Sequence, residues 1–130
     1  MRMSSKAKIL VVEDNPVNLE LFADLLNVGG YEYVNTSKGE EALEISRKES
    51  FDLVLLDIQL PGIDGLTVAK TLKSNASTKH TKIIALTAYA MKGDREMFLE
   101  KGFDGYIAKP VTMKEFLEAV EGYLKGSNEL

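Results

Sequence analysis

The sequence contains no cysteine and a single histidine among its 130 residues. Without cysteine the chain has no disulfide framework, thiolate metal site or cysteine nucleophile, so its fold depends on a hydrophobic core alone. The absence of cysteine also fits a reducing cytoplasm. The one histidine, His80, lies in the polar segment Ser77–Lys82, and we interpret it as a solvated side chain rather than a ligand.

Long apolar runs are also missing from the chain. The longest, Ile9–Val12 and Leu53–Leu56, are far too short to span a bilayer. No apolar stretch follows the charged residues at the amino terminus, so we expect no secretory signal peptide. The formal net charge is −4, and the sequence lacks the basic stripe that neutralises nucleic-acid phosphates. We therefore expect a cytoplasmic protein that binds neither nucleic acid nor membranes.

The composition that is present is typical of one globular domain. Hydrophobic residues make up 45% of the chain and charged residues 28%, as in ordinary globular proteins. A chain of this length forms one domain, and no internal repeat, linker or low-complexity segment divides it. We predict a single domain across residues 1–130, with a core over about 7–125 and short disordered tails at both ends.

Hydrophobic patterns of two kinds alternate along the chain. Short apolar runs bounded by polar residues predict strands at Lys8–Val12, Tyr31–Val34, Asp52–Leu56, Lys82–Leu86 and Gly105–Ala108. Apolar residues at helical spacing follow each run. This alternation predicts an α/β fold, a doubly wound (βα)5 sandwich with a five-stranded parallel sheet, similar to flavodoxin. Such a sheet binds its ligand at the carboxyl ends of its strands.

Capping residues mark where the predicted helices begin. The candidate caps are Asn15 before Pro16, Ser37 with Glu40, Asp64, and Thr112 with Glu115. A further helix is predicted from about Met91 to Lys101, and Gly102 ends it. We interpret Gly62 and Gly65 as turn glycines.

Polar side chains follow four of the five predicted strands. Glu13 and Asp14 follow the first strand, Asp57 the third, Thr87 ends the fourth, and Lys109 follows the fifth. The carboxyl ends of parallel strands meet at one edge of a sheet, so we expect these side chains to lie together. Three adjacent carboxylates repel one another unless a cation lies among them. Oxygen ligands without histidine or cysteine suit Mg²⁺, with Mn²⁺ as a possible substitute.

Each of these side chains also has an ordinary structural explanation. Asp14 could cap the following helix, Thr87 suits any strand, and Lys109 could be a surface lysine. Their convergence instead favours phosphoryl transfer. Asp57, central in the sheet, would be the nucleophile and form an acyl phosphate. Lys109 and the Thr87 hydroxyl would hold phosphoryl oxygens by hydrogen bonds.

Four segments carry a resemblance to a known family. They are VVEDN at 11–15, LLDIQLPGIDG at 55–65, ALTA at 85–88 and YIAKP at 106–110. Through them the chain resembles the receiver domains of bacterial two-component signalling, the CheY-like family, over nearly its whole length. Segments 14–22 and 85–94 are also similar to single-domain cell-cycle regulators and to receiver domains attached to hybrid histidine kinases.

The resemblance implies a role for each residue of the predicted site. Glu13, Asp14 and Asp57 would bind Mg²⁺, together with the backbone carbonyl group of Gln59. Asp57 would be the phosphorylated residue.

The resemblance also implies a switch. Thr87 would be the switch hydroxyl, Tyr106 the switch aromatic residue, and Lys109 the lysine that binds the phosphoryl group. The Lys109–Pro110 peptide bond is expected to be cis, as is usual in the family.

We therefore expect a phosphoacceptor in a two-component phosphorelay, not an enzyme that acts on external substrates. It would catalyse only its own phosphorylation by a phosphohistidine donor and a slow autodephosphorylation. The expected partners are a histidine kinase or a histidine phosphotransfer protein, and a downstream protein. The downstream protein would bind the face formed by the helix from about Met91 to Lys101, the strand with Tyr106, and the last helix.

Other functions remain as alternatives. A haloacid-dehalogenase-type phosphatase needs a second aspartate two residues after its nucleophile, and Gln59 occupies that position here. A flavodoxin-like cofactor module needs a phosphate-binding loop after the first strand, where this chain has Glu13 and Asp14. The chain could also be a scaffold that is never phosphorylated, or a receiver domain excised from a hybrid histidine kinase.

Overall fold

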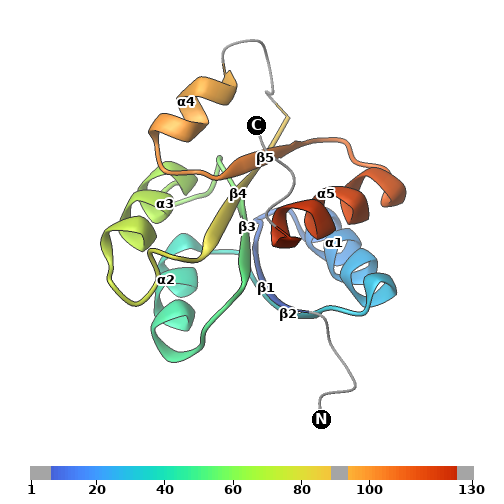
Figure 1. Cartoon of the computed structure of the whole chain (residues 1–130), viewed down its shortest axis with the longest axis horizontal. Helices are drawn as coiled ribbons and strands as arrows, with labels where there is room; N and C mark the ends of the chain where they lie inside the picture. The colour runs from blue at the N-terminus through green and yellow to red at the C-terminus, as the bar shows by residue number, and fades with distance from the viewer. Residues whose placement is uncertain (1–6, 89–93, 126–130) are drawn as a thin grey trace.

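A parallel sheet between two layers of helices forms the body of the protein (Figure 1). The computed structural model describes residues 7–88 and 94–125. The strands are β1 (Lys8–Val12), β2 (Glu32–Thr36), β3 (Leu53–Asp57), β4 (Lys82–Thr87) and β5 (Gly105–Ala108). The helices are α1 (Pro16–Gly29), α2 (Gly39–Lys48), α3 (Gly65–Ser74), α4 (Asp94–Glu100) and α5 (Met113–Lys125).

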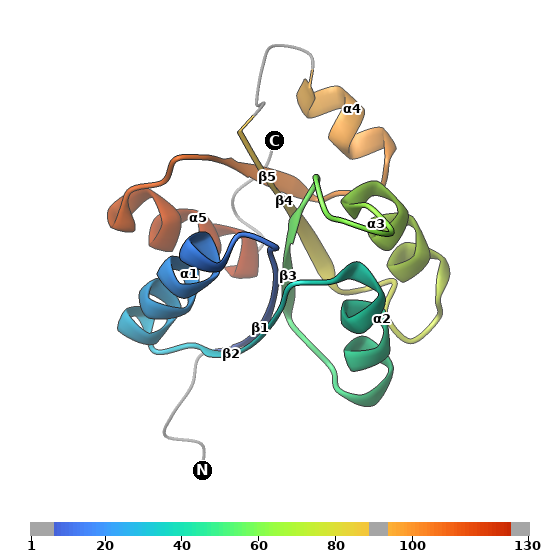
Figure 2. The same ribbon diagram turned by 180° about the vertical axis from the view of Figure 1, so that it is seen from behind.

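The sheet has the strand order β2-β1-β3-β4-β5, and all its strands are parallel. Helices α1 and α5 cover one face, and α2, α3 and α4 cover the other, as Figures 1 and 2 show from opposite sides. This order confirms the predicted doubly wound (βα)5 fold. Its switch point lies between β1 and β3, where ligands of such folds bind.

Each face of the sheet has its own apolar cluster. On the α1 and α5 side, the rings of Phe22 and Phe116 stack with centroids 5.3 Å apart. On the other side, Phe98 of α4 packs against Phe103 and Tyr106, each at 5.8 Å. Every residue of β3 is buried, as expected for a central parallel strand covered on both faces. Within the described ranges, no helix is long and apolar enough to cross a membrane.

Three of the four predicted helix caps are confirmed. The Asn15 side chain accepts hydrogen bonds from the N–H groups of Val17 and Asn18. Asp64 Oδ1 accepts from the N–H of Thr67 at 2.9 Å, and Thr112 Oγ1 accepts from the N–H of Glu115 at 3.1 Å. Each cap satisfies an N–H group that has no partner inside its helix.

The capping box predicted at Ser37 and Glu40 is wrong. Helix α2 has Lys38 as its N-cap residue, without a capping side chain. The side chain of Thr36 instead forms hydrogen bonds with the start of this helix. Its hydroxyl accepts a hydrogen bond from the N–H of Lys38 and donates one to the side chain of Glu41. The helix begins one residue later than the capping-box pattern implies, because the last residue of β2 supplies the anchoring hydroxyl.

Several predicted boundaries differ from the structure or lie outside the described residues. Strand β3 spans Leu53–Asp57 rather than Asp52–Leu56, and β2 and β4 end at Thr36 and Thr87 rather than at Val34 and Leu86. The second strand begins at Glu32 rather than Tyr31, because the backbone of Tyr31, two residues after α1, is still hydrogen-bonded to that helix. Its N–H donates to the carbonyl oxygen of Leu26 after the left-handed Gly30 (φ 82°). The predicted start of the fourth helix at Met91 and the predicted disordered tails lie outside the described residues, and α4 is described from Asp94.

Gly65, the first residue of α3, allows this helix to touch the backbone at the end of β3. A Cβ atom at this position would lie 2.3 Å from the carbonyl oxygen of Asp57 and 2.8 Å from Cα of Ile58. The Gly65 N–H donates to the carbonyl oxygen of Ile58 at 3.0 Å. The interpretation of Gly65 as a turn glycine is therefore wrong, because it lies within a helix, whereas Gly62 has the positive φ of a turn residue (75°).

We predict that Gly65→Ala lowers the free energy of unfolding by about 2 kcal/mol or more, since the added methyl group meets backbone atoms that no side-chain rotation can move. Chemical denaturation measures the change. Ser74→Ala, at an exposed position of the same helix, serves as the control and should be near neutral. Equal stability of the Gly65→Ala variant and the wild type would contradict the close packing described here.

Candidate phosphoacceptor site

The predicted site residues meet at the carboxyl edge of the sheet. Glu13 and Asp14 follow β1, Asp57 ends β3, Thr87 ends β4, and Lys109 follows β5. All five residues line one cleft, together with Asn15, Asn18, Ile58, Gln59 and Ala88. The topology explains this convergence, because β1, β3, β4 and β5 are successive neighbours in a parallel sheet.

Three carboxylates form the acidic part of this cleft. Glu13, Asp14 and Asp57 each offer an oxygen atom, and these atoms all lie within 4.8 Å of one another. Glu13 and Asp57 are buried, with 1% and 6% of their surfaces exposed, whereas Asp14 is exposed. Two of the three charges are therefore held where water solvates them poorly.

Lys109 compensates the two buried charges. Its Nζ lies 2.8 Å from Glu13 Oε1 and 3.2 Å from Asp57 Oδ2. Burial lowers the pKa of Lys109, but the contacts with Glu13 and Asp57 outweigh burial and raise it above its ordinary value. The ammonium group is therefore charged at neutral pH and bridges carboxylates from two neighbouring strands.

Backbone N–H groups hold the other oxygen of each buried carboxylate. Asp57 Oδ1 accepts a hydrogen bond from the N–H of Gln59 at 3.0 Å. Glu13 Oε2 accepts one from the N–H of Asn15 at 3.1 Å. Both carboxylates thus keep a fixed orientation, with one oxygen bound to the backbone and the other beside Lys109.

One buried oxygen atom of the site, on Glu13, has no hydrogen-bond donor among the described residues. Glu13 Oε1 accepts no well-directed hydrogen bond, although it lies within ion-pair distance of Lys109. Burial raises the pKa of Glu13, and repulsion by Asp57 raises it further, against the effect of Lys109. A buried oxygen without a hydrogen bond, next to two more carboxylates, fits a hard divalent cation such as Mg²⁺.

Thr87 and Tyr106 differ in their position relative to this cleft. Thr87 is buried and lines the cleft beside the exposed Ala88. Tyr106 does not line the cleft; it pairs with Ala85 of β4, two residues before Thr87. Its half-buried ring packs against Phe98 of α4 at 5.8 Å. The structure therefore places Thr87 in the cleft with the acids and the Tyr106 ring outside the cleft, against α4.

Two further features complete the site. The Lys109–Pro110 peptide bond is cis, as predicted. Gly65 contacts the backbone of Asp57, and the sequence interpretation missed this contact. The signal that could have revealed it is a glycine directly after the N-cap Asp64, at a position where most residues form helices better than glycine does.

Comparison with known proteins identifies the family. Residues 9–121 match the response regulator receiver domain. The polar-differentiation response regulator DivK of Brucella ovis is 45% identical over 116 residues, which cover 89% of this chain and 94% of DivK. This match agrees with the resemblance of segments 14–22 and 85–94 to single-domain regulators.

Solved structures agree with the sequence comparison. A CheY-like response regulator receiver domain protein from Methanospirillum hungatei is 30% identical, with a TM-score of 0.83 over 92% of this chain and 94% of that one. The receiver domain of the sensor histidine kinase PA1611 from Pseudomonas aeruginosa is 33% identical, with a TM-score of 0.84 over 92% of this chain and 98% of that one. That structure contains a magnesium ion coordinated in the active-site cleft. On the family match, the relatives and the fold together, this chain belongs to the response regulator receiver domain family.

Proposed function

We propose that the chain is a phosphoacceptor in a two-component phosphorelay, with Asp57 as the residue that is phosphorylated. The observation that carries this proposal is the position of Asp57. Its carboxylate is buried at the end of the central strand β3 and is oriented by the N–H of Gln59. It lies 3.2 Å from Lys109 and within 4.8 Å of two more carboxylates.

In the proposed reaction, an oxygen of Asp57 attacks the phosphorus atom of a phosphohistidine. A P–O bond forms while the P–N bond of the donor breaks, and the donor imidazole leaves with the electron pair and takes up a proton. Lys109 exchanges its contact with Asp57 for one with a phosphoryl oxygen, because the added charge attracts its ammonium group. The hydroxyl of Thr87, on the adjacent strand β4, binds a second phosphoryl oxygen.

The same residues support a magnesium site. Glu13, Asp14 and Asp57, with the carbonyl group of Gln59, would hold the ion, and the related receiver domain of PA1611 carries magnesium in its cleft. When bound, Mg²⁺ would neutralise charge on the carboxylates and on the incoming phosphoryl group. Without such neutralisation, an anionic carboxylate attacks an anionic phosphoryl group poorly.

Thr87 and Tyr106 would carry the signal away from the site. Binding of the Thr87 hydroxyl to a phosphoryl oxygen would draw Thr87 inward and free space beside β5. The Tyr106 ring, now against Phe98, would turn into that space. Phosphorylation then needs only to favour one of two packing arrangements by a few kcal/mol.

The expected partners follow from this role. A histidine kinase or a histidine phosphotransfer protein would supply the phosphoryl group, and a downstream protein would read the face formed by α4, β5 and α5. The cysteine-free sequence supports a reducing compartment, and we place the protein in the cytoplasm. Family membership favours this function over a haloacid-dehalogenase-type phosphatase, and turnover of an external phosphomonoester would contradict it.

Incubation with acetyl phosphate and Mg²⁺ tests the assignment of Asp57. We expect one phosphoryl group per chain by intact-protein mass spectrometry, and none on the Asp57→Asn variant, since an amide is not nucleophilic. Asp64→Asn is the matched control, because asparagine is also a good N-cap residue at the start of α3. Undiminished labelling of Asp57→Asn would refute the assignment.

Asp14→Asn tests the metal site. Removal of one carboxylate should raise the stability of the metal-free protein by about 1 kcal/mol, because repulsion with Glu13 and Asp57 falls. Mg²⁺ should stabilise the wild type, by about 2.7 kcal/mol at a hundred times its Kd, and should stabilise this variant far less. Thermal denaturation in Mg²⁺ and in EDTA measures both effects. The control is Glu20→Gln, an exposed acid on α1, and equal wild-type melting temperatures in both buffers would exclude the site.

Substitutions of Thr87 test the switch. Thr87→Ala should still accept beryllofluoride, a phosphoryl analogue, at Asp57, but the Tyr106 ring should not change position, since the hydroxyl that couples the two is gone. Thr87→Ser keeps this hydroxyl and should retain the change. NMR of the Tyr106 ring, with and without beryllofluoride, gives the result. A ring that moves equally in Thr87→Ala and in the wild type would rule out the coupling through Thr87.

A further inference from the structure

Strand β5 lies at an edge of the sheet, where it pairs with β4 alone. An edge strand presents a row of N–H and C=O groups that have no strand to pair with. The N–H of Lys109 donates to the carbonyl oxygen of Thr87 in β4. Because alternate residues of a strand direct their backbone groups to opposite sides, Gly105 and Ile107 face β4, and the backbone groups of Tyr106 face the open edge.

Tyr123 of α5 binds both of these outward groups with one hydroxyl. Its oxygen accepts a hydrogen bond from the N–H of Tyr106 at 3.3 Å, and its O–H donates to the carbonyl oxygen of Tyr106 at 3.2 Å. A phenol can do both, since it has one donor and free acceptor sites. Tyr123 is only 6% exposed, so water has little access to this bridge.

Gly105 is the residue that lets the hydroxyl reach the strand. A Cβ atom at this position would lie 2.4 Å from both Cε1 and the hydroxyl oxygen of Tyr123. The backbone of Gly105 has no positive φ, so its conformation alone does not require glycine. Contact with Tyr123 therefore explains why this position has no side chain.

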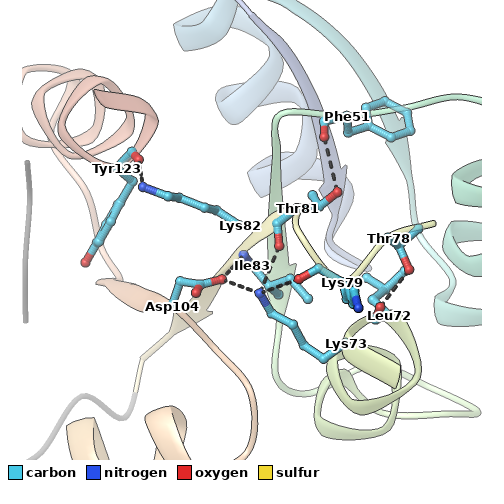
Figure 3. A network of polar contacts seen from close by, with 10 residues as sticks. All are labelled: Phe51, Leu72, Lys73, Thr78, Lys79, Thr81, Lys82, Ile83, Asp104 and Tyr123. Carbon is cyan, nitrogen blue, oxygen red and sulfur yellow. Dashed lines mark hydrogen bonds and ion pairs between the residues drawn. The ribbon is translucent and has the colours of Figure 1, made fainter. Parts of the chain in front are cut away.

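Neighbouring polar contacts anchor both partners of the bridge to β4 (Figure 3). Lys82, at the start of β4, donates from Nζ to the carbonyl oxygen of Tyr123 at 2.6 Å. Directly before β5, Asp104 Oδ2 accepts hydrogen bonds from the N–H of Ile83 at 2.8 Å and from Lys73 Nζ at 2.9 Å. The end of α5 and the start of β5 are thus fixed to the same strand.

The ring of Tyr106 lies on the other side of the sheet from the ring of Tyr123. It belongs to the apolar cluster under α2, α3 and α4 and contacts Phe98, whereas Tyr123 belongs to the cluster under α1 and α5. The backbone of Tyr106 is therefore held from one face, and its ring is packed on the opposite face.

We propose that Tyr123 is a positioning residue for the switch: its hydroxyl fixes the backbone of Tyr106, so that only the Tyr106 ring changes position when Asp57 is phosphorylated. This inference rests on the proposed function, in which Tyr106 is the switch aromatic. It assigns α5 a part in that switch through a contact with the strand backbone, and it assigns Gly105 the role of admitting that contact.

Amide hydrogen exchange measured by NMR, without metal or phosphoryl analogue, tests whether the hydroxyl holds the strand. In Tyr123→Phe, the Tyr106 amide should exchange about tenfold faster than in the wild type, as expected when one hydrogen bond is lost. Gly105→Ala keeps the hydroxyl but displaces it, and should have the same effect. The control is Tyr33→Phe, on the opposite edge strand β2, which removes a hydroxyl that accepts a hydrogen bond from Asn27 of α1. Unchanged exchange in Tyr123→Phe would overturn the proposal.

The response of the Tyr106 ring to beryllofluoride and Mg²⁺ then tests positioning. In the wild type and Tyr33→Phe, the ring signals should shift between two states. In Tyr123→Phe, the loosened strand should let the ring sample both positions beforehand, so the shift should fall below half of the wild-type value. A lower melting temperature with an unchanged shift would make Tyr123 merely structural and overturn the proposal. A wild-type ring that does not respond would instead contradict the proposed switch itself, and the role of Tyr123 would fall with it.

Discussion

The ammonium group of Lys109 contacts two buried carboxylates, Glu13 and Asp57, that come from different strands. Two adjacent buried acids without a cation would destabilise the end of the sheet, because each charge would lack both water and a counterion. With Lys109 between them, the acids can remain charged and close together. In the proposed function, the same closeness would give the acids an affinity for a divalent cation and would make the lysine available to an incoming anion. The balance of charge in the folded protein and the proposed chemistry therefore both depend on the contacts of Lys109 with these two carboxylates.

Two close approaches between helix and strand hold this region in place. Gly65 lets α3 touch the backbone of Asp57, and Gly105 lets Tyr123 of α5 touch the backbone at Tyr106. Neither glycine has a positive φ. Both are required by the space that a neighbouring element occupies, on opposite faces of the sheet. The proposed phosphoacceptor and the proposed switch residue are thus each positioned through the backbone, while their side chains remain available for function.

The sequence predicted the fold, and it predicted that the candidate site residues lie together, because both follow from hydrophobic patterns along the chain. Continuous apolar runs identify buried strands, and the rule that parallel strands meet at one edge brings Glu13, Asp57 and Lys109 together without further information. Contacts between distant side chains leave no such pattern. The anchoring of α2 by Thr36, instead of the predicted capping box at Ser37, depends on where β2 ends. The hydroxyl bridge from Tyr123 to Tyr106 joins residues 17 positions apart and has no sequence signature.

The hydrogen bonds between Tyr123 of α5 and the backbone of β5 have a consequence for the order in which the elements fold. The edge of β5 carries exposed pairing groups until α5 docks, and α5 follows all other elements in the chain. During synthesis the sheet can therefore be complete while this edge is still open to strands of other molecules. Docking of Tyr123 provides partners for the outward N–H and C=O groups of Tyr106. Loss of α5 would therefore expose two things at once: the outward backbone groups of Tyr106 and the apolar cluster to which Phe116 and Val120 contribute.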